Sequence, residues 1–226
     1  MLTQYRQTVQ RLLKDEKQER FNLFDLTDWI NVARGQVAGE GEATRALVLF
    51  TTTPAMNFYN FSGISLAAVA GAASVLSVRM ITGGGALLTP REWEWFNSYY
   101  IPAPTSGAPR DWCQYGQGAQ GSFLLNPVPN AATALHLDLV FLPIPLVDDA
   151  TVEAIPYPWT DAVPYYAAYQ AYLTAQDSGN AKNMLDLYEI FMRRARTLAT
   201  PTVLPLQYEM GHSALSAPAA ASQQAA

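Results

Sequence analysis

The stretch that most constrains the fold runs from Ile155 to Leu204, because its apolar spacing predicts two antiparallel helices joined by a tight turn. Thr160 is the expected N-cap of the first helix. The turn at Asp177 to Asn180 is expected to supply a C-cap glycine and the cap of the second helix. Pro201 then stops that helix. Such a hairpin must bury its apolar faces against other elements.

The first helix of this hairpin has two unlike faces. Its aromatic face is expected to pack in the core, with a subunit contact as the alternative, because tyrosine suits surfaces where one end of the side chain stays wet. That face comprises Ala162, Tyr165, Tyr166, Tyr169, Tyr172 and Leu173. The opposite face would let another helix approach closely, because its side chains are small. It comprises Val163, Ala167, Ala171 and Thr174.

Two more amphipathic helices are predicted near the N-terminus. The apolar residues of the first recur at helical spacing from Leu2 to Leu13. The second is expected to begin after Asp25 as N-cap and to end at Gly39 and Gly41. Its predicted buried stripe comprises Leu26, Trp29, Ile30, Ala33 and Val37.

Between these helix pairs the pattern changes to strands. Arg45 to Thr52 is β-branched and apolar, and Leu76 to Ile81 alternates. The clearest alternation lies in Thr133 to Leu142, for which Ser122 to Asn126 is the expected hairpin partner. Thr89 to Glu92 is interpreted as a capping box that opens a short helix.

The sequence therefore predicts an α+β fold, in which an antiparallel helical bundle of two N-terminal and two C-terminal helices carries an inserted β-rich domain. The bundle is expected to comprise residues 1–42 and 151–205, and the insertion residues 43–150. Residues 206–226 are expected to form a flexible tail that a partner orders, because their composition cannot bury enough apolar surface.

Composition favours an assembly and excludes several classes of protein. Only 15% of the residues are charged, against roughly 25% in ordinary soluble domains, so part of the surface is expected to be hidden in an assembly. The net charge of −5 argues against tight nucleic-acid binding. A single cysteine excludes a disulfide framework. No signal peptide or membrane span is expected, because the start is amphipathic and the uncharged run from Ile64 to Val78 is short.

Three patterns, and the acidic cluster described in the next paragraph, raise the question of a catalytic or ligand-binding site. Gly116 to Gly121 matches G-x-G-x-x-G, but a strand is expected to follow it and a proline-rich loop to precede it, which favours a plain glycine loop over a dinucleotide site. Cys113, His136 and Asp138 could be written as a nucleophile with its base. His212 has no evident partner for a metal site.

Acidic residues cluster just before the hairpin, at Asp148, Asp149 and Glu153. Paired catalytic carboxylates are one interpretation. Solvated loop acids, or partners for a neighbouring subunit's arginines, are the alternative. Arg193, Arg194 and Arg196 fall in the last turns of the final helix, where cations also complement the helix dipole.

Several motifs in a fixed order resemble those of tailed-bacteriophage virion proteins, and most closely the head-to-tail connector (adaptor) proteins beneath the portal. The resemblance spans about residues 3 to 205. The motifs are L-T-D-W-I-N from Leu26, A-R-x-Q-V-A from Ala33, Y-G-Q-G-x-x-G-S-F from Tyr115 running into N-P-V-P, D-A-V-P-Y-Y-A-A-Y from Asp161, and R-R-A-R from Arg193. None of them is a catalytic signature.

The resemblance implies a non-enzymatic structural protein of the virion, assembled in the host cytoplasm, without a cofactor or metal. It implies a ring, commonly of twelve copies, that binds the portal and tail or nozzle proteins while DNA passes through without specific binding. Contact residues to a neighbouring subunit or the portal are then expected among Tyr165, Tyr169, Tyr172, Arg193, Arg194, Arg196, Asp148 and Asp149. A tail-tube, head-decoration or minor capsid protein and a virion-associated hydrolase stay open as alternatives, as do the copy number and the portal-facing end.

Overall fold

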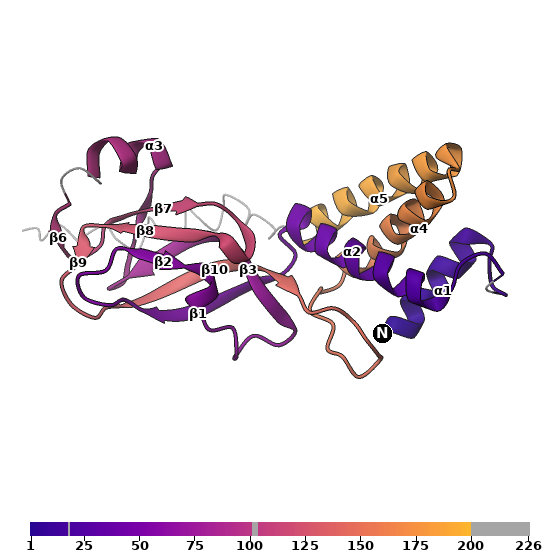
Figure 1. Ribbon diagram of the computed structural model, residues 1–226, viewed down its shortest axis with the longest axis horizontal. Coiled ribbons are helices and arrows are strands. Elements are labelled where there is room, and N and C mark those ends of the chain that lie inside the picture. Colours follow the sequence, from indigo (N-terminus) through magenta and orange to yellow (C-terminus); the bar gives the residue numbers. More distant parts are fainter. Residues whose placement is uncertain (18, 101–103, 200–226) are drawn as a thin grey trace, which may run out of the picture.

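A computed structural model describes residues 1–17, 19–100 and 104–199 of the chain (Figure 1). The molecule is α+β, as the sequence predicts, with most of its helical residues at one end and its sheets at the other. The predicted tail, residues 206–226, and His212 lie outside the described residues. The helices are α1 (Leu2–Leu13), α2 (Leu23–Gly41), α3 (Trp93–Trp95), α4 (Val163–Thr174) and α5 (Ser178–Ala199).

The two N-terminal helices form where their apolar residues recur, but α2 begins earlier than predicted. Its N-cap is Asn22, whose side-chain oxygen accepts a hydrogen bond from the backbone N–H of Asp25 at 2.8 Å. The prediction that Asp25 caps the helix is therefore wrong, because an asparagine three residues earlier already satisfies that N–H. α1 ends at Lys14, which adopts a left-handed conformation with φ 55°.

The C-terminal hairpin forms two helices. The predicted N-cap of α4 and the predicted C-cap glycine are wrong, but the cap of α5 lies within the predicted turn. Thr160 lies inside a short 3-10 turn, Trp159–Asp161, which precedes α4. Gly179 lies in the first turn of α5, not at the end of α4. The residue that caps α5 is Asp177, whose carboxylate accepts the backbone N–H of Asn180 at 3.1 Å.

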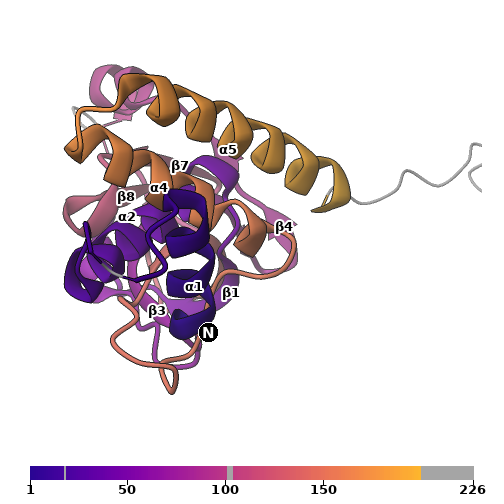
Figure 2. The same ribbon diagram turned by 90° about the vertical axis from the view of Figure 1, so that its right-hand side faces the viewer.

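Both faces of α4 are used within the chain. The helix contacts α5 on one side and α1 and α2 on the other (Figure 2). Its small side chains, such as Ala167 and Ala171, have no exposed surface, which is how neighbouring helices come close. The ring of Tyr165 stacks on Phe191 of α5, with 4.5 Å between the centroids. The tyrosine face therefore packs largely against helices of its own chain, although Leu173 is 45% exposed, and Ala167 and Ala171 of the small face are more deeply buried.

The β-rich region contains two four-stranded sheets and a short pair. One sheet is antiparallel and has the order β1-β10-β3-β4. The other has the order β2-β8-β7-β5, and β6 pairs with β9. The strands are β1 (Arg45–Thr51), β2 (Phe58–Asn60), β3 (Ala72–Gly83), β4 (Ala86–Leu87), β5 (Thr89–Pro90), β6 (Ser106–Gly107), β7 (Asp111–Tyr115), β8 (Ser122–Asn126), β9 (Val128–Pro129) and β10 (Ala134–Pro143).

Two local predictions in this region are wrong. β8 was expected to pair with the strand from Thr133, but it pairs with β7 and β2 in the other sheet. A hairpin closed by the glycine loop brings β7 to β8, and that pairing leaves β10 to lie between β1 and β3. The expected capping box is also absent, because Thr89 and Pro90 form a strand beside β7 and α3 starts only after Glu92.

The molecule has two main hydrophobic clusters. One joins α1, α2, α4 and α5, and the other fills the space between the two four-stranded sheets. Alternation explains the second cluster, because Leu135, Leu137 and Leu139 of β10 point inward and are at most 1% exposed. Within the described ranges, no helix combines the length and apolar character needed to cross a membrane.

Candidate functional site

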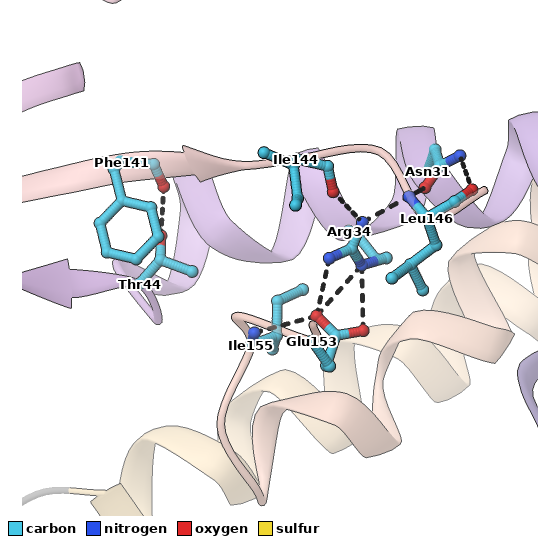
Figure 3. Close-up of polar contacts among 8 residues, drawn as sticks. All are labelled: Asn31, Arg34, Thr44, Phe141, Ile144, Leu146, Glu153 and Ile155. Atoms are coloured by element: carbon cyan, nitrogen blue, oxygen red, sulfur yellow. Dashed lines mark hydrogen bonds and ion pairs between the residues drawn. The ribbon is translucent and has the colours of Figure 1, made fainter. Parts of the chain in front are cut away.

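The helices and the sheets meet at a buried polar cluster around Arg34 (Figure 3). Arg34 lies on α2 and is 1% exposed. Its Nη2 donates to Glu153 Oε1 at 2.8 Å, and its Nε lies 3.0 Å from Glu153 Oε2, so the pair is bidentate. Its Nη1 donates to the carbonyl of Ile144 at 2.7 Å. One guanidinium therefore binds the segment that leaves β10 at both of its ends.

Asn31, one helical turn before Arg34, binds the same segment near its start. Its side-chain oxygen accepts the backbone N–H of Leu146 at 2.8 Å, and its amide nitrogen donates to the Leu146 carbonyl at 3.1 Å. The Asn31 oxygen also accepts from Arg34 at 3.2 Å. The side chains of α2 thus replace strand pairing for the segment, and they fix its path after β10.

Glu153 makes further contacts within the cluster. The carboxylate accepts the backbone N–H of Ile155 at 3.0 Å as well as the guanidinium bonds. Tyr5 of α1 lies nearby, and burial together with the negative charge of Glu153 raises the pKa of its phenol. Tyr5 therefore stays neutral, and the cluster holds one cation and one anion. Such an arrangement positions elements and offers no group poised to exchange protons.

The structure does not bring together the predicted nucleophile and its base. Cys113 of β7 is buried in a small cluster with Phe96 and Leu124, on the outer side of its sheet. His136 and Asp138 lie on β10 of the other sheet and alternate with its inward-pointing leucines. Burial raises the pKa of the Cys113 thiol to about 12, which leaves almost no thiolate at neutral pH. Asp138 forms an ion pair with Arg45.

The acidic cluster is divided among separate interactions. Asp148 accepts hydrogen bonds from Thr151, which lower the pKa of its carboxyl. Asp149 accepts from the N-terminal ammonium at 2.8 Å and from Thr3, and these bonds lower its pKa. Glu153 binds Arg34. A catalytic acid needs a raised pKa, so these environments do not suit a carboxylate pair.

The glycine loop differs from the prediction in what precedes it. A strand, β7, leads into Gly116, where a proline-rich loop was expected. A 3-10 turn and then β8 follow, so no helix N-terminus faces the loop to receive a pyrophosphate. Gly116 and Gly118 have φ values of 74° and 66°, which explains glycine at these turn positions. Among the described residues, no cluster of His, Cys, Asp and Glu could hold a metal ion.

The predicted contact residues divide into internal and exposed groups. Tyr165 and Tyr169 are half-buried, and Tyr172 is buried with its hydroxyl donating to the Leu12 carbonyl at 3.0 Å. Arg196 donates to the carbonyl of Glu40 at 2.9 Å. The exposed members are Arg193, Arg194, Arg196, Asp148 and Asp149.

Sequence reasoning missed two features of the surface and the junction. The role of Arg34 was not predicted, although the motif A-R-x-Q-V-A contains it, because its partner lies 119 residues away. An apolar pocket beside the start of α2 was also missed. Its exposed side chains include Phe24 and Val147, both 74% exposed. The sequence offered one signal for this pocket, because Phe24 lies outside the predicted buried stripe of α2.

The chain is similar to one family of known proteins. The model of the family described as SU10 adaptor protein matches residues 2–205. No curated protein matches the chain. The family match includes every helix and strand described above, so it does not rest on a single motif.

Proposed function

This chain belongs to the SU10 adaptor protein family, a family of phage head-tail adaptors, and from that membership we propose that it forms a ring beneath the portal. In this role it joins the capsid to the tail and lines the channel through which DNA is ejected. The main support for this proposal is the family match over residues 2–205. The absence of an assembled nucleophile among the described residues agrees with a structural role.

The surface composition supports an assembled state. Several large apolar side chains are more than half exposed in the isolated chain, and they occur on helices and sheets alike. They include Phe24, Leu47, Leu49, Val147, Ile190 and Leu198. Exposed apolar side chains that lie together mark protein interfaces, and Phe24 and Val147 line one pocket. We propose twelve copies, each burying two flanks against its neighbours and two ends against the portal and the tail.

The net charge of the chain supports a channel wall that does not bind DNA. The chain carries a net charge of −5. An acidic wall repels phosphate, so a genome can slide past it. Of the residues expected to make contacts, Arg193, Arg194 and Asp148 have exposed side chains that could reach a neighbour. Tyr165, Tyr169 and Tyr172 would act chiefly by supporting α4 from within.

We also propose that the helical and the β-rich parts of the chain act as separate domains. Residues 1–42 and 151–205 act as one antiparallel helical bundle, and residues 43–150 act as an inserted β-rich domain. The separate hydrophobic clusters of helices and sheets support this division. Residues 206–226 are proposed to dock on the portal.

The test is the mass of the chain in solution, measured by light scattering with and without the portal of the same virion. We expect a complex of ring size when portal is added, with twelvefold symmetry in electron micrographs. Sixfold or threefold rings would point instead to a tail component, and a chain indifferent to portal would overturn the proposal. A chain lacking residues 210–226 tests the tail: unchanged portal attachment would remove that part.

A further inference from the structure

An apolar pocket of about 460 Å³ lies where the start of α2 meets the segment after β10. Leu23 is 39% exposed at its rim, and Phe24 and Val147 are 74% exposed. Asp28 contributes an acidic side chain to the lining. We call this site the α2 pocket. Apolar side chains this exposed leave the pocket only partly filled by its own chain, so it can receive a side chain from outside.

A matching apolar surface lies on α5. Ile190 is 53% exposed and Leu198 is 58% exposed, and Arg194 lies between them. The three residues are spaced by four, so they share one face of the helix. We call this face the α5 stripe. Its solvent exposure contrasts with Tyr188 and Met192, which are 2% and 3% exposed on the inner face of the same helix.

Each surface has charged side chains beside its apolar residues, acidic ones at the pocket and basic ones at the stripe. Asp28 lines the α2 pocket and Asp148 directly follows Val147, while Arg193 and Arg194 lie on or beside the α5 stripe. Arg6 adds a positive charge to the pocket lining, where its guanidinium donates to the hydroxyl of Thr27, and Asp186 and Glu189 add negative charge on α5 before the two arginines. Within the described part of the chain, Arg193 and Arg194 form no ion pair. Complementary charge of this kind favours and orients an encounter between copies.

The two surfaces also face different ways. In both views α5 forms one side of the helical end, and the segment after β10 extends from the other side, beyond α1 and α2 (Figures 1 and 2). A surface that binds a different surface of the next copy makes a head-to-tail contact, and such contacts close into rings when the rotation allows. A single chain cannot satisfy this contact with itself.

We propose that the α5 stripe of one copy docks into the α2 pocket of the next copy. Ile190 and Leu198 contact Phe24 and Val147, and Arg193 and Arg194 face Asp28 and Asp148. The inference rests on the ring proposed above and assigns its subunit contact.

Crosslinking tests the contact directly. Val147→Cys is combined with Leu198→Cys in one chain, the ring is assembled on portal, and a short bismaleimide is added. We expect a ladder of covalent oligomers up to ring size. The single variants are controls, and a pair of Leu49→Cys with Leu198→Cys is the matched control, because Leu49 is 63% exposed on β1. Cys113 is buried and adds no background.

Charge reversal provides the second arm. Arg194→Glu or Asp28→Lys alone should raise the subunit concentration needed for assembly about tenfold or more, and the double variant should recover most of the loss. Circular dichroism of each monomer checks that it is folded. If the unaltered chain forms rings but neither the ladder nor the recovery is seen, the contact is wrong and the ring stands. If the unaltered chain forms no ring on portal, both proposals fall.

Discussion

Arg34 shows how one side chain can determine the path of a whole segment. Its guanidinium is almost fully removed from water, and an ion in that position is tolerated only when its counterion and hydrogen-bond acceptors are in place. Glu153 and the carbonyl of Ile144 supply them. Any arrangement of the segment that withdraws these acceptors leaves a buried charge unpaired, so the segment between β10 and α4 has few alternative paths.

Replacing Arg34 should therefore cost far more than replacing an exposed arginine. We expect Arg34→Met to lower the free energy of unfolding by about 3–5 kcal/mol, because Glu153 loses its counterion in a buried site. The matched control is Arg79→Met, whose ion pair with Glu42 is half exposed and should contribute about 1 kcal/mol or less. Urea unfolding of both variants measures the difference. Equal losses would show that burial of the pair has no special effect.

At the scale of single residues, few of the interactions in the site could be predicted from the sequence. Its spacing placed Ala33 and Val37 on the buried stripe correctly, yet Arg34 is equally buried between them. Local periodicity cannot identify a partner that is distant in the chain. The same limit applies to Cys113, His136 and Asp138, whose residue types suggested chemistry that the sheet topology then separates.

The C-terminal end of α2 packs very closely against a neighbouring side chain. A Cβ added at Gly41 would lie 2.5 Å from the ring of Trp159, which is itself 6% exposed. The indole therefore packs directly on the helix backbone. Gly35, in the same helix, has no neighbouring atom within 4 Å of such a Cβ. Gly41 therefore has no room for a side chain, whereas Gly35 in the same helix does.

Alanine at these two positions should have opposite effects. We expect Gly41→Ala to destabilise the chain by about 1–3 kcal/mol, because the Trp159 ring must move in a packed core. Gly35→Ala should stabilise it by about 0.5–1 kcal/mol, since alanine lowers the entropy cost of forming the helix. Thermal melts followed by circular dichroism compare the two. A gain in melting temperature for Gly41→Ala would show that the ring relaxes freely.

Elements were predictable where one face is buried and the other is not. Alternation identified β10 because its leucines point inward while Ala134 and His136 are exposed. β8 was found as a strand but its partner was not, because residues 122–125 are all buried and leave no alternation to set a face. The N-cap of α4 and the C-cap glycine were misplaced because several neighbouring residues suit each role, whereas the cap of α5 lies in the predicted turn, at Asp177.

The molecule as a whole has one core of helices and another of sheets, joined through Arg34 and the segment after β10. We expect substitutions in each core to act mainly on its own half. Ile30→Ala should lower the stability of the helices, and Leu137→Ala that of the sheets, by about 2–5 kcal/mol each, because both side chains are fully buried. Hydrogen exchange resolved by segment measures the two losses. If either substitution weakens protection equally throughout, the halves unfold as one unit.

The 119 residues that separate Arg34 from Glu153 also set an order in time. At a synthesis rate of about 5–20 residues per second, the carboxylate emerges roughly 6–24 s after the guanidinium that it neutralises. Throughout that interval the first two helices lack the hairpin that covers their apolar faces, while the strands between are already being made. The chain length of the β-rich region therefore acts as a delay, and the helical half becomes complete only after all the strands have been synthesised.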